Sequence, residues 1–175
     1  NNSAGTYLYL AIAADPDTTT PVVASSFDVV TYTGTGAAQD ISTNFKPDLV
    51  WAKTRTYSSA TSHRLVDSVR GATKEIYSDL TNAEATDANG ISSFNEDGFS
   101  FGGNHGSNLS GAPSVAWVWK AGDHDDNLPQ INTNGSIDSI VSVNDAAGFS
   151  IVKWTNESSA SDTIGHGLSS APELY

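Results

Sequence analysis

Short apolar runs alternate with polar turn residues along the chain, and this pattern predicts β-strands. Runs rich in Val, Ile, Thr, Tyr and Trp are bounded mostly by Gly, Asn, Asp, Ser or Pro. Many short strands separated by turn signals are typical of antiparallel sandwiches and barrels. We therefore expect an all-β fold, an antiparallel β-sandwich of jelly-roll or lectin-like type. The predicted strands cover residues 6–13, 27–33, 48–54, 63–69, 91–94, 98–102, 114–120, 136–143 and 149–155.

The run 114–120 predicts a central strand, because both of its faces are largely apolar. Successive side chains of a strand point to opposite faces, so Val115, Trp117 and Trp119 share one face and Ala116 and Val118 share the other. A tryptophan on a strand usually belongs to the core. We therefore expect Trp117 and Trp119 to be buried between the sheets, and we assign Trp51 and Trp154 to the core as well.

Two other segments carry local signals. Residues 95–98 contain Asp-Gly between two predicted strands, which is a strong hairpin signal. Residues 74–86 are the only helix candidate, because Ile76 and Leu80 are spaced four apart. The polar residues in that segment dilute the pattern, so an irregular loop is the alternative.

The chain repeats part of its own sequence. Residues 27–51 resemble residues 149–175, and residues 2–13 more weakly resemble residues 108–121. Repetition of so large a unit is typical of a tandem array of domains. The matched pairs include Phe27 with Phe149, Val30 with Val152, Tyr32 with Trp154, Pro47 with Pro172 and Leu49 with Leu174.

This repetition predicts the domain boundaries. We expect residues 1–21 to be the end of a preceding repeat plus a linker, and residues 22–122 to be a complete β-sandwich module. Residues 123–175 are expected to be a linker and the start of a following repeat. The chain contains no Met, so its first residue is expected to be an interior position of a longer protein. The strands 6–13 and 149–155 need partners, which could be the complete module, each other or another subunit. We favour their pairing into a sheet that residues 27–121 do not make alone.

The amino-acid composition limits the cross-links, ligands and partners that the chain can have. The chain has no Cys, which excludes disulfides and thiolate metal sites, and its net charge is −12. An acidic protein is a poor partner for nucleic acid and for anionic membranes. No run approaches the roughly 20 apolar residues of a membrane span. We therefore expect no nucleic acid, no membrane insertion and no cofactor.

Residues 46–74 depart from the acidic average, since they hold six basic residues and two acids. These charges can be solvated strand edges, or a docking face for an acidic glycan or a neighbouring subunit. In the second case the ligand-binding candidates are Arg55, Arg64 and Arg70, together with Tyr57, a loop aromatic that could stack on a sugar.

Two further clusters contain residue types that can catalyse a reaction or bind a metal ion. His63 and Asp67 share one face of a predicted strand, where a carboxylate could orient an imidazole for acid–base work. No nucleophile motif accompanies them, so we assign no catalytic residue and do not expect an enzyme. Asp123, Asp125 and Asp126 could bind Ca²⁺, but EF-hand spacing is absent and a solvated linker is the alternative.

The strings FKPDLVWAKTR, HRLVDSVRG, SFNEDGFSFG and VAWVWKAG resemble a domain that recurs in structural proteins of tailed bacteriophages, with marine phages well represented. The resemblance covers residues 27–121, and residues 148–175 resemble a second start. It implies a virion location and a structural role in a tail fibre, spike or head decoration. The implied partners are other virion subunits, with a homotrimer favoured, and a host-surface glycan. Two alternatives stay open: a glycan-binding adhesin domain of a secreted bacterial protein, and a polysaccharide-degrading enzyme.

Overall fold

The protein is described from a computed structural model, which covers residues 6–13, 23–58, 61–122, 129–155 and 161–175. The chain divides into two compact units. Unit 2 is Val23–Lys120, and unit 1 combines Asn1–Val22 with Ala121–Tyr175. Among the described residues, no helix has both the length and the apolar character needed to cross a membrane.

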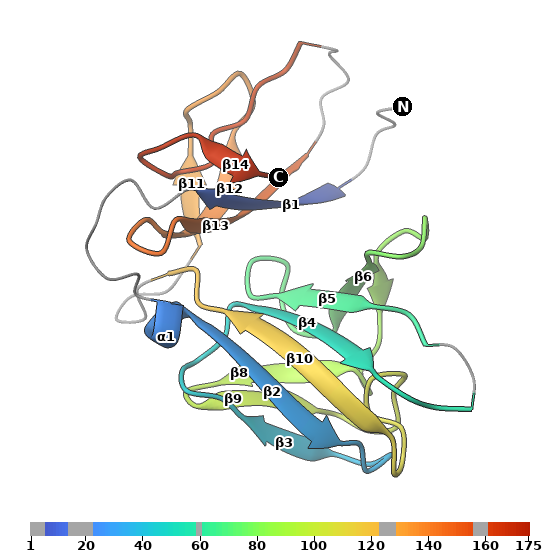
Figure 1. Cartoon of the computed structure of the whole chain (residues 1–175). Coiled ribbons are helices and arrows are strands. Elements are labelled where there is room, and N and C mark those ends of the chain that lie inside the picture. The colour runs from blue at the N-terminus through green and yellow to red at the C-terminus, as the bar shows by residue number, and fades with distance from the viewer. Residues whose placement is uncertain (1–5, 14–22, 59–60, 123–128, 156–160) are drawn as a thin grey trace. The chain divides into compact units, whose positions relative to one another are not determined.

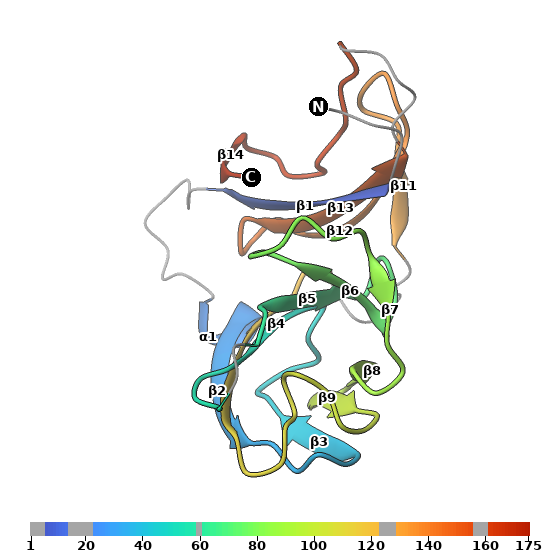
Figure 2. The same cartoon turned by 90° about the vertical axis from the view of Figure 1, so that its right-hand side faces the viewer.

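Unit 2 is an antiparallel β-sandwich, which confirms the predicted all-β class. One sheet has the strand order β2-β10-β4-β5-β6-β7 and the other has the order β3-β9-β8. Figures 1 and 2 show the two sheets stacked on each other. The elements of unit 2 are α1 (Val23–Ser26), β2 (Phe27–Thr33), β3 (Gln39–Ser42), β4 (Leu49–Thr54), β5 (Arg64–Asp67), β6 (Lys74–Tyr77), β7 (Ala85–Thr86), β8 (Ile91–Asn95), β9 (Gly98–Phe101) and β10 (Pro113–Trp119).

The core of unit 2 combines large side chains of the small sheet with small side chains of the large sheet. Phe99 and Phe101 of β9 are 0% and 1% exposed, while Ala116 and Val118 of β10 are both fully buried. Close packing requires such complementary volumes, because a core has little empty space. The face of β10 that enters the core is therefore the one with the smaller residues.

The expected burial of Trp117 and Trp119 between the sheets is wrong. Both side chains lie on the other face of β10 and are partly exposed. Trp119 packs on Phe27 with ring centroids 5.0 Å apart, and Trp117 packs on Trp51 at 5.8 Å. Alternation along the strand identified the two faces correctly, but it could not tell which face the second sheet would cover.

The helix predicted for residues 74–86 is absent, because its ends form β6 and β7. These strands pair with each other through Lys74 with Thr86, and β6 also pairs with β5 through Leu65 and Ile76. Leu80 is 46% exposed and therefore contributes no apolar stripe. Pairing with β5 decides the conformation where local spacing was ambiguous.

The hairpin predicted at residues 95–98 is confirmed. β8 and β9 pair antiparallel, with Asn95 opposite Gly98. Gly98 has φ 156°, and a Cβ atom there would lie 2.0 Å from the Ile41 carbonyl oxygen of β3. Only glycine permits this close approach of β9 to its neighbour.

Unit 1 contains one antiparallel sheet that joins distant parts of the chain. Its strand order is β11-β12-β13-β1-β14 (Figure 1). Strand β1 pairs with β13 over seven positions, from Thr6 opposite Thr155 to Ile12 opposite Phe149. Of the partners considered for these two strands, the structure shows that they pair with each other, which confirms the favoured sheet outside residues 27–121. The strands are β1 (Thr6–Ala13), β11 (Gln130–Asn132), β12 (Ser139–Asn144), β13 (Phe149–Thr155) and β14 (Pro172–Leu174).

Candidate functional site

The segment that follows β4 lines a hollow of about 300 Å³. Its wall includes Lys53, Arg55, Tyr57 and Thr61. Two bonds hold this wall in place: the Arg55 amide donates to the Pro113 carbonyl at 2.8 Å, and Lys53 Nζ donates to the Thr61 carbonyl. The hollow therefore combines a hydrogen-bonded backbone with a cationic and aromatic rim.

Two of the four predicted ligand-binding residues meet at this hollow. Arg55 is exposed, and Tyr57 is 46% exposed. A phenol ring can stack on the apolar face of a sugar, while a guanidinium can donate to hydroxyl or carboxylate oxygens. The rim that they form therefore has the chemistry of a glycan site.

The other two predicted ligand-binding residues lie in internal ion pairs. Arg64 Nε is 3.3 Å from Glu75 Oε1. Arg70 Nε is 2.5 Å from Asp67 Oδ2, and the Arg70 side chain is only 2% exposed. Neither guanidinium lines the hollow.

Internal acids also compensate much of the basic zone at residues 46–74. Arg70 Nη1 lies 3.2 Å from Glu84, and Lys46 Nζ lies 3.0 Å from Glu96. Together with the pairs made by Arg64 and Arg70, these contacts reduce the positive charge that a docking partner would meet.

The structure gives His63 and Asp67 different partners. Trp51 Nε1 donates to His63 Nδ1 at 2.9 Å, and the rings are 5.7 Å apart. The Asp67 carboxylate accepts from the amide and the guanidinium of Arg70. The proposed acid–base pair is therefore replaced by two structural interactions.

A buried polar cluster, which the sequence did not reveal, lies between β6 and the loop after β9. Glu75 Oε1 accepts a hydrogen bond from Tyr77 Oη at 2.7 Å and one from Arg64, and Glu75 Oε2 is 2.9 Å from His105 Nε2. The side chains of Glu75 and His105 are 4% and 2% exposed. We call these four residues, Arg64, Glu75, Tyr77 and His105, the Glu75 cluster.

Glu75 is held in its ionised form. Burial alone would raise its pKa, but hydrogen bonds from His105 and Tyr77, with nearby positive charge that includes Arg64, lower it from 4.5 to about 2. A carboxylate stabilised so strongly is a poor general base, because it has little tendency to take up a proton near neutral pH.

Hydrogen bonding at His105 argues against a metal site here. Glu75, Asp87 and His105 offer ligand atoms within 4.8 Å of one another. The Ser107 amide donates to His105 Nδ1 at 3.2 Å, so Nε2 carries the proton and donates it to Glu75. A metal on Nε2 of a neutral imidazole would require the proton on Nδ1, where it would face the Ser107 N–H. The cluster therefore suits a structural role.

Sequence reasoning missed the Glu75 cluster for two reasons. Glu75 lay in the helix candidate, and His105 lies 30 positions away in a glycine-rich loop. The available signal was strand alternation over residues 74–77, which would have placed Glu75 and Tyr77 on one face.

Two other sequence predictions concern the C-terminal part of the chain. The calcium candidates Asp123, Asp125 and Asp126 lie outside the described residues. Trp154, which we assigned to the core, is partly exposed and lines a hollow of about 470 Å³ in unit 1 with Ile131, Ile140 and Lys153.

Comparison with known proteins identifies the family but gives no activity. No curated protein and no solved structure matches the chain. One family model matches residues 23–175, which include all of unit 2 and the C-terminal strands of unit 1. The chain therefore belongs to the family described as Domain of unknown function (DUF7483).

Proposed function

We propose that this chain is a structural module of a phage virion appendage, such as a tail fibre, spike or head decoration, and that it assembles with other virion subunits, with a homotrimer favoured. The phage resemblance of the strings between residues 27 and 121 supports this location. The single observation that carries the structural role is the Glu75 cluster. The Glu75 carboxylate and the His105 imidazole are buried, and the carboxylate bonds both to the imidazole and to the guanidinium of Arg64, a side chain that is 16% exposed, as in a network that stabilises a fold.

The other candidate for acid–base chemistry supports the same conclusion. His63 Nδ1 accepts a hydrogen bond from the Trp51 indole, and the backbone amide of His63 donates one to Asp79 Oδ1 at 3.0 Å. A general base needs a free nitrogen lone pair within reach of substrate. Because Nδ1 of His63 accepts from the Trp51 indole, the neutral imidazole carries its proton on Nε2 and has no free lone pair left. The proposal is therefore a non-catalytic module.

The virion location has a direct test. Particles should be purified by density gradient from cells that carry the gene and analysed by quantitative mass spectrometry. We expect peptides of this chain to co-purify with the particle at a constant ratio to its other proteins. A chain that stays in the soluble fraction while particles form normally would contradict the proposal.

Glycan binding at the hollow after β4 is a second candidate function. The specific observation in its favour is that Arg55 and Tyr57, two residues nominated as ligand-binding, lie together on one rim. Such a site would let a structural module contribute to host attachment. It also fits the alternative of an adhesin domain from a secreted bacterial protein.

Binding to a glycan array distinguishes these possibilities. If the hollow binds a sugar, Tyr57→Ala should weaken binding about tenfold, which corresponds to roughly 1.4 kcal/mol. Arg55→Ala should have its largest effect on acidic glycans, because it removes a cation. Tyr175→Ala is the matched control, since Tyr175 is 79% exposed and lies outside the hollow. Equal binding by all three variants, or no binding by the wild type, would exclude this site.

A further inference from the structure

In each unit one strand lies between two strands that the repeated sequence aligns, and we call it the central strand of those three. In unit 2, β10 lies between β2 and β4, and Trp119 is opposite both Phe27 and Leu49. In unit 1, β1 lies between β13 and β14, and Ile12 is opposite both Phe149 and Leu174.

The repeated sequence relates the same positions independently of the pairing. Alignment of residues 27–51 with 149–175 matches Phe27 with Phe149 and Leu49 with Leu174. The two flanking residues of the central strand are therefore equivalent both in sequence and in register. The order β13-β1-β14 therefore corresponds to β2-β10-β4, although β1 pairs with β14 at only two positions.

The origin of the central strand differs between the units. In unit 2 it follows β2 and β4 in the same continuous segment. In unit 1 it precedes β13 by more than one hundred residues, with all of unit 2 between them in the sequence. The strand that lies between β13 and β14 is therefore far from both of them along the chain. In the sequence, residues 14–22 connect it to unit 2.

We propose that the space between β13 and β14 is an acceptor site for the β1 strand of a second copy of this chain. An exchanged strand makes the same backbone ladder as a strand of the same chain, so the contacts in the sheet are unchanged. The balance between the two states then depends on protein concentration relative to the effective concentration of the tethered strand.

Exchange from each copy to the next is a head-to-tail contact. Such contacts form closed rings when the rotation closes and open fibres when it does not. Any closed exchange, from a reciprocal dimer to a larger ring, leaves no acceptor site empty. This inference rests on strand register and topology, and it stands whether or not the protein belongs to a virion.

Cysteine cross-linking of the full chain tests the exchange, because the chain has no native Cys. Ala11 of β1 is opposite Ser150 of β13. Directly opposite residues of antiparallel strands have Cα atoms about 4.5–5.5 Å apart, which suits a disulfide. Ser150 Oγ is buried and has no hydrogen-bond partner in the structure, so S150C removes no described bond. One variant should carry A11C and the other S150C with a tag that changes its size.

The two variants are mixed and oxidised, and we expect a disulfide-linked heterodimer. Its yield should rise with protein concentration, because the β1 strand of a second copy competes with the tethered β1 strand of the same chain. The yield should reach roughly tenfold that of the control mixture. The control pairs A11C with T86C, because Thr86 is exposed and lies in β7 of unit 2. A second pair, L8C with K153C, tests the same register at a less buried position of β13.

The double variant A11C/S150C separates the possible outcomes. A disulfide within one chain at low concentration, together with heterodimers from the single variants, supports exchange. A disulfide within one chain at every concentration, with heterodimers at the control level for both pairs, overturns it. Failure of A11C/S150C and of a second double variant, L8C/K153C, to form any disulfide would overturn the β1–β13 register and the proposal with it.

Discussion

Replacing Phe99 with Ala is expected to destabilise unit 2 by about 3–5 kcal/mol, the range for deletion of a large core side chain. Phe99 is 0% exposed and belongs to the cluster between the two sheets. The deletion removes apolar contacts and leaves a cavity that the facing strands cannot fill. Hydrogen exchange of β9 and β10 peptides, measured by mass spectrometry, reports the stability of unit 2 separately from unit 1.

Two control variants sharpen this prediction. Phe94→Ala removes the same side chain from a partly buried position at the edge of the core, so its cost should be smaller. Trp117→Ala removes a larger side chain from the face of β10 outside the core, and it should also cost less than Phe99→Ala. If Trp117→Ala proved the most destabilising of the three, the assignment of the two faces of β10 would be wrong.

Replacing Glu75 with Gln is expected to cost about 3–5 kcal/mol, because loss of one member of a buried ion pair leaves its partner uncompensated. Arg64 would lose its counter-charge, and His105 would lose a charged acceptor. Glu96→Gln is the matched control, since it also breaks one ion pair, with Lys46 at 3.0 Å.

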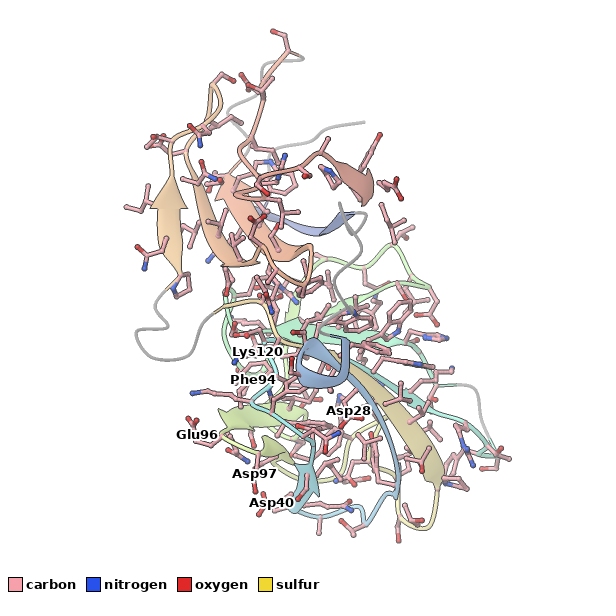
Figure 3. All side chains as sticks on the ribbon, turned by 60° about the vertical axis from the view of Figure 1, so that its left-hand side comes forward. Asp28, Asp40, Phe94, Glu96, Asp97 and Lys120 are labelled. Carbon is pink, nitrogen blue, oxygen red and sulfur yellow. The ribbon has the colours of Figure 1, made fainter. Side chains whose placement is uncertain are left out.

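The control should have little effect. The Glu96 side chain is 84% exposed and projects from the β8–β9 turn (Figure 3). Exposed ion pairs contribute about 0–1 kcal/mol, so Glu96→Gln should lie in that range. Similar losses for the two variants, again measured by hydrogen exchange in unit 2, would contradict the structural role of the Glu75 cluster.

The same pair of variants predicts a pH dependence. Folding lowers the pKa of Glu75 from 4.5 to about 2, so the folded state favours the carboxylate. Its contribution is complete above pH 4.5 and is lost as the pH falls towards 2. The stability difference between wild type and Glu75→Gln should therefore shrink over that interval. A difference that stays constant to pH 2 would show that the pKa of Glu75 is not lowered.

Local sequence signals were sufficient for the longer strands and for one hairpin, but they did not predict the short strands β3, β6, β7, β11 and β14. The runs 27–33 and 149–155 became β2 and β13 with unchanged bounds, because apolar and β-branched residues bounded by turn residues specify an extended segment directly. Asp97-Gly98 likewise specified the β8–β9 turn.

The placement of residues that meet across the fold was decided by tertiary structure. Glu75 and His105 are 30 positions apart, and nothing local to either residue predicts their contact. Arg55 and Tyr57 reached a common hollow because they are close in sequence, whereas Arg64 and Arg70 were paired with buried acids.

The sequence by itself determined that this chain is an acidic, cysteine-free, all-β protein with two alternating faces on each strand. Only the tertiary structure decided that β10 turns Ala116 and Val118 inwards, since Phe99 and Phe101 of the opposing sheet already fill the core. It also decided that β1 pairs with β13. The physical reason is the same in both cases: periodicity is a property of a segment, whereas packing volume and strand pairing depend on partners that are remote in sequence.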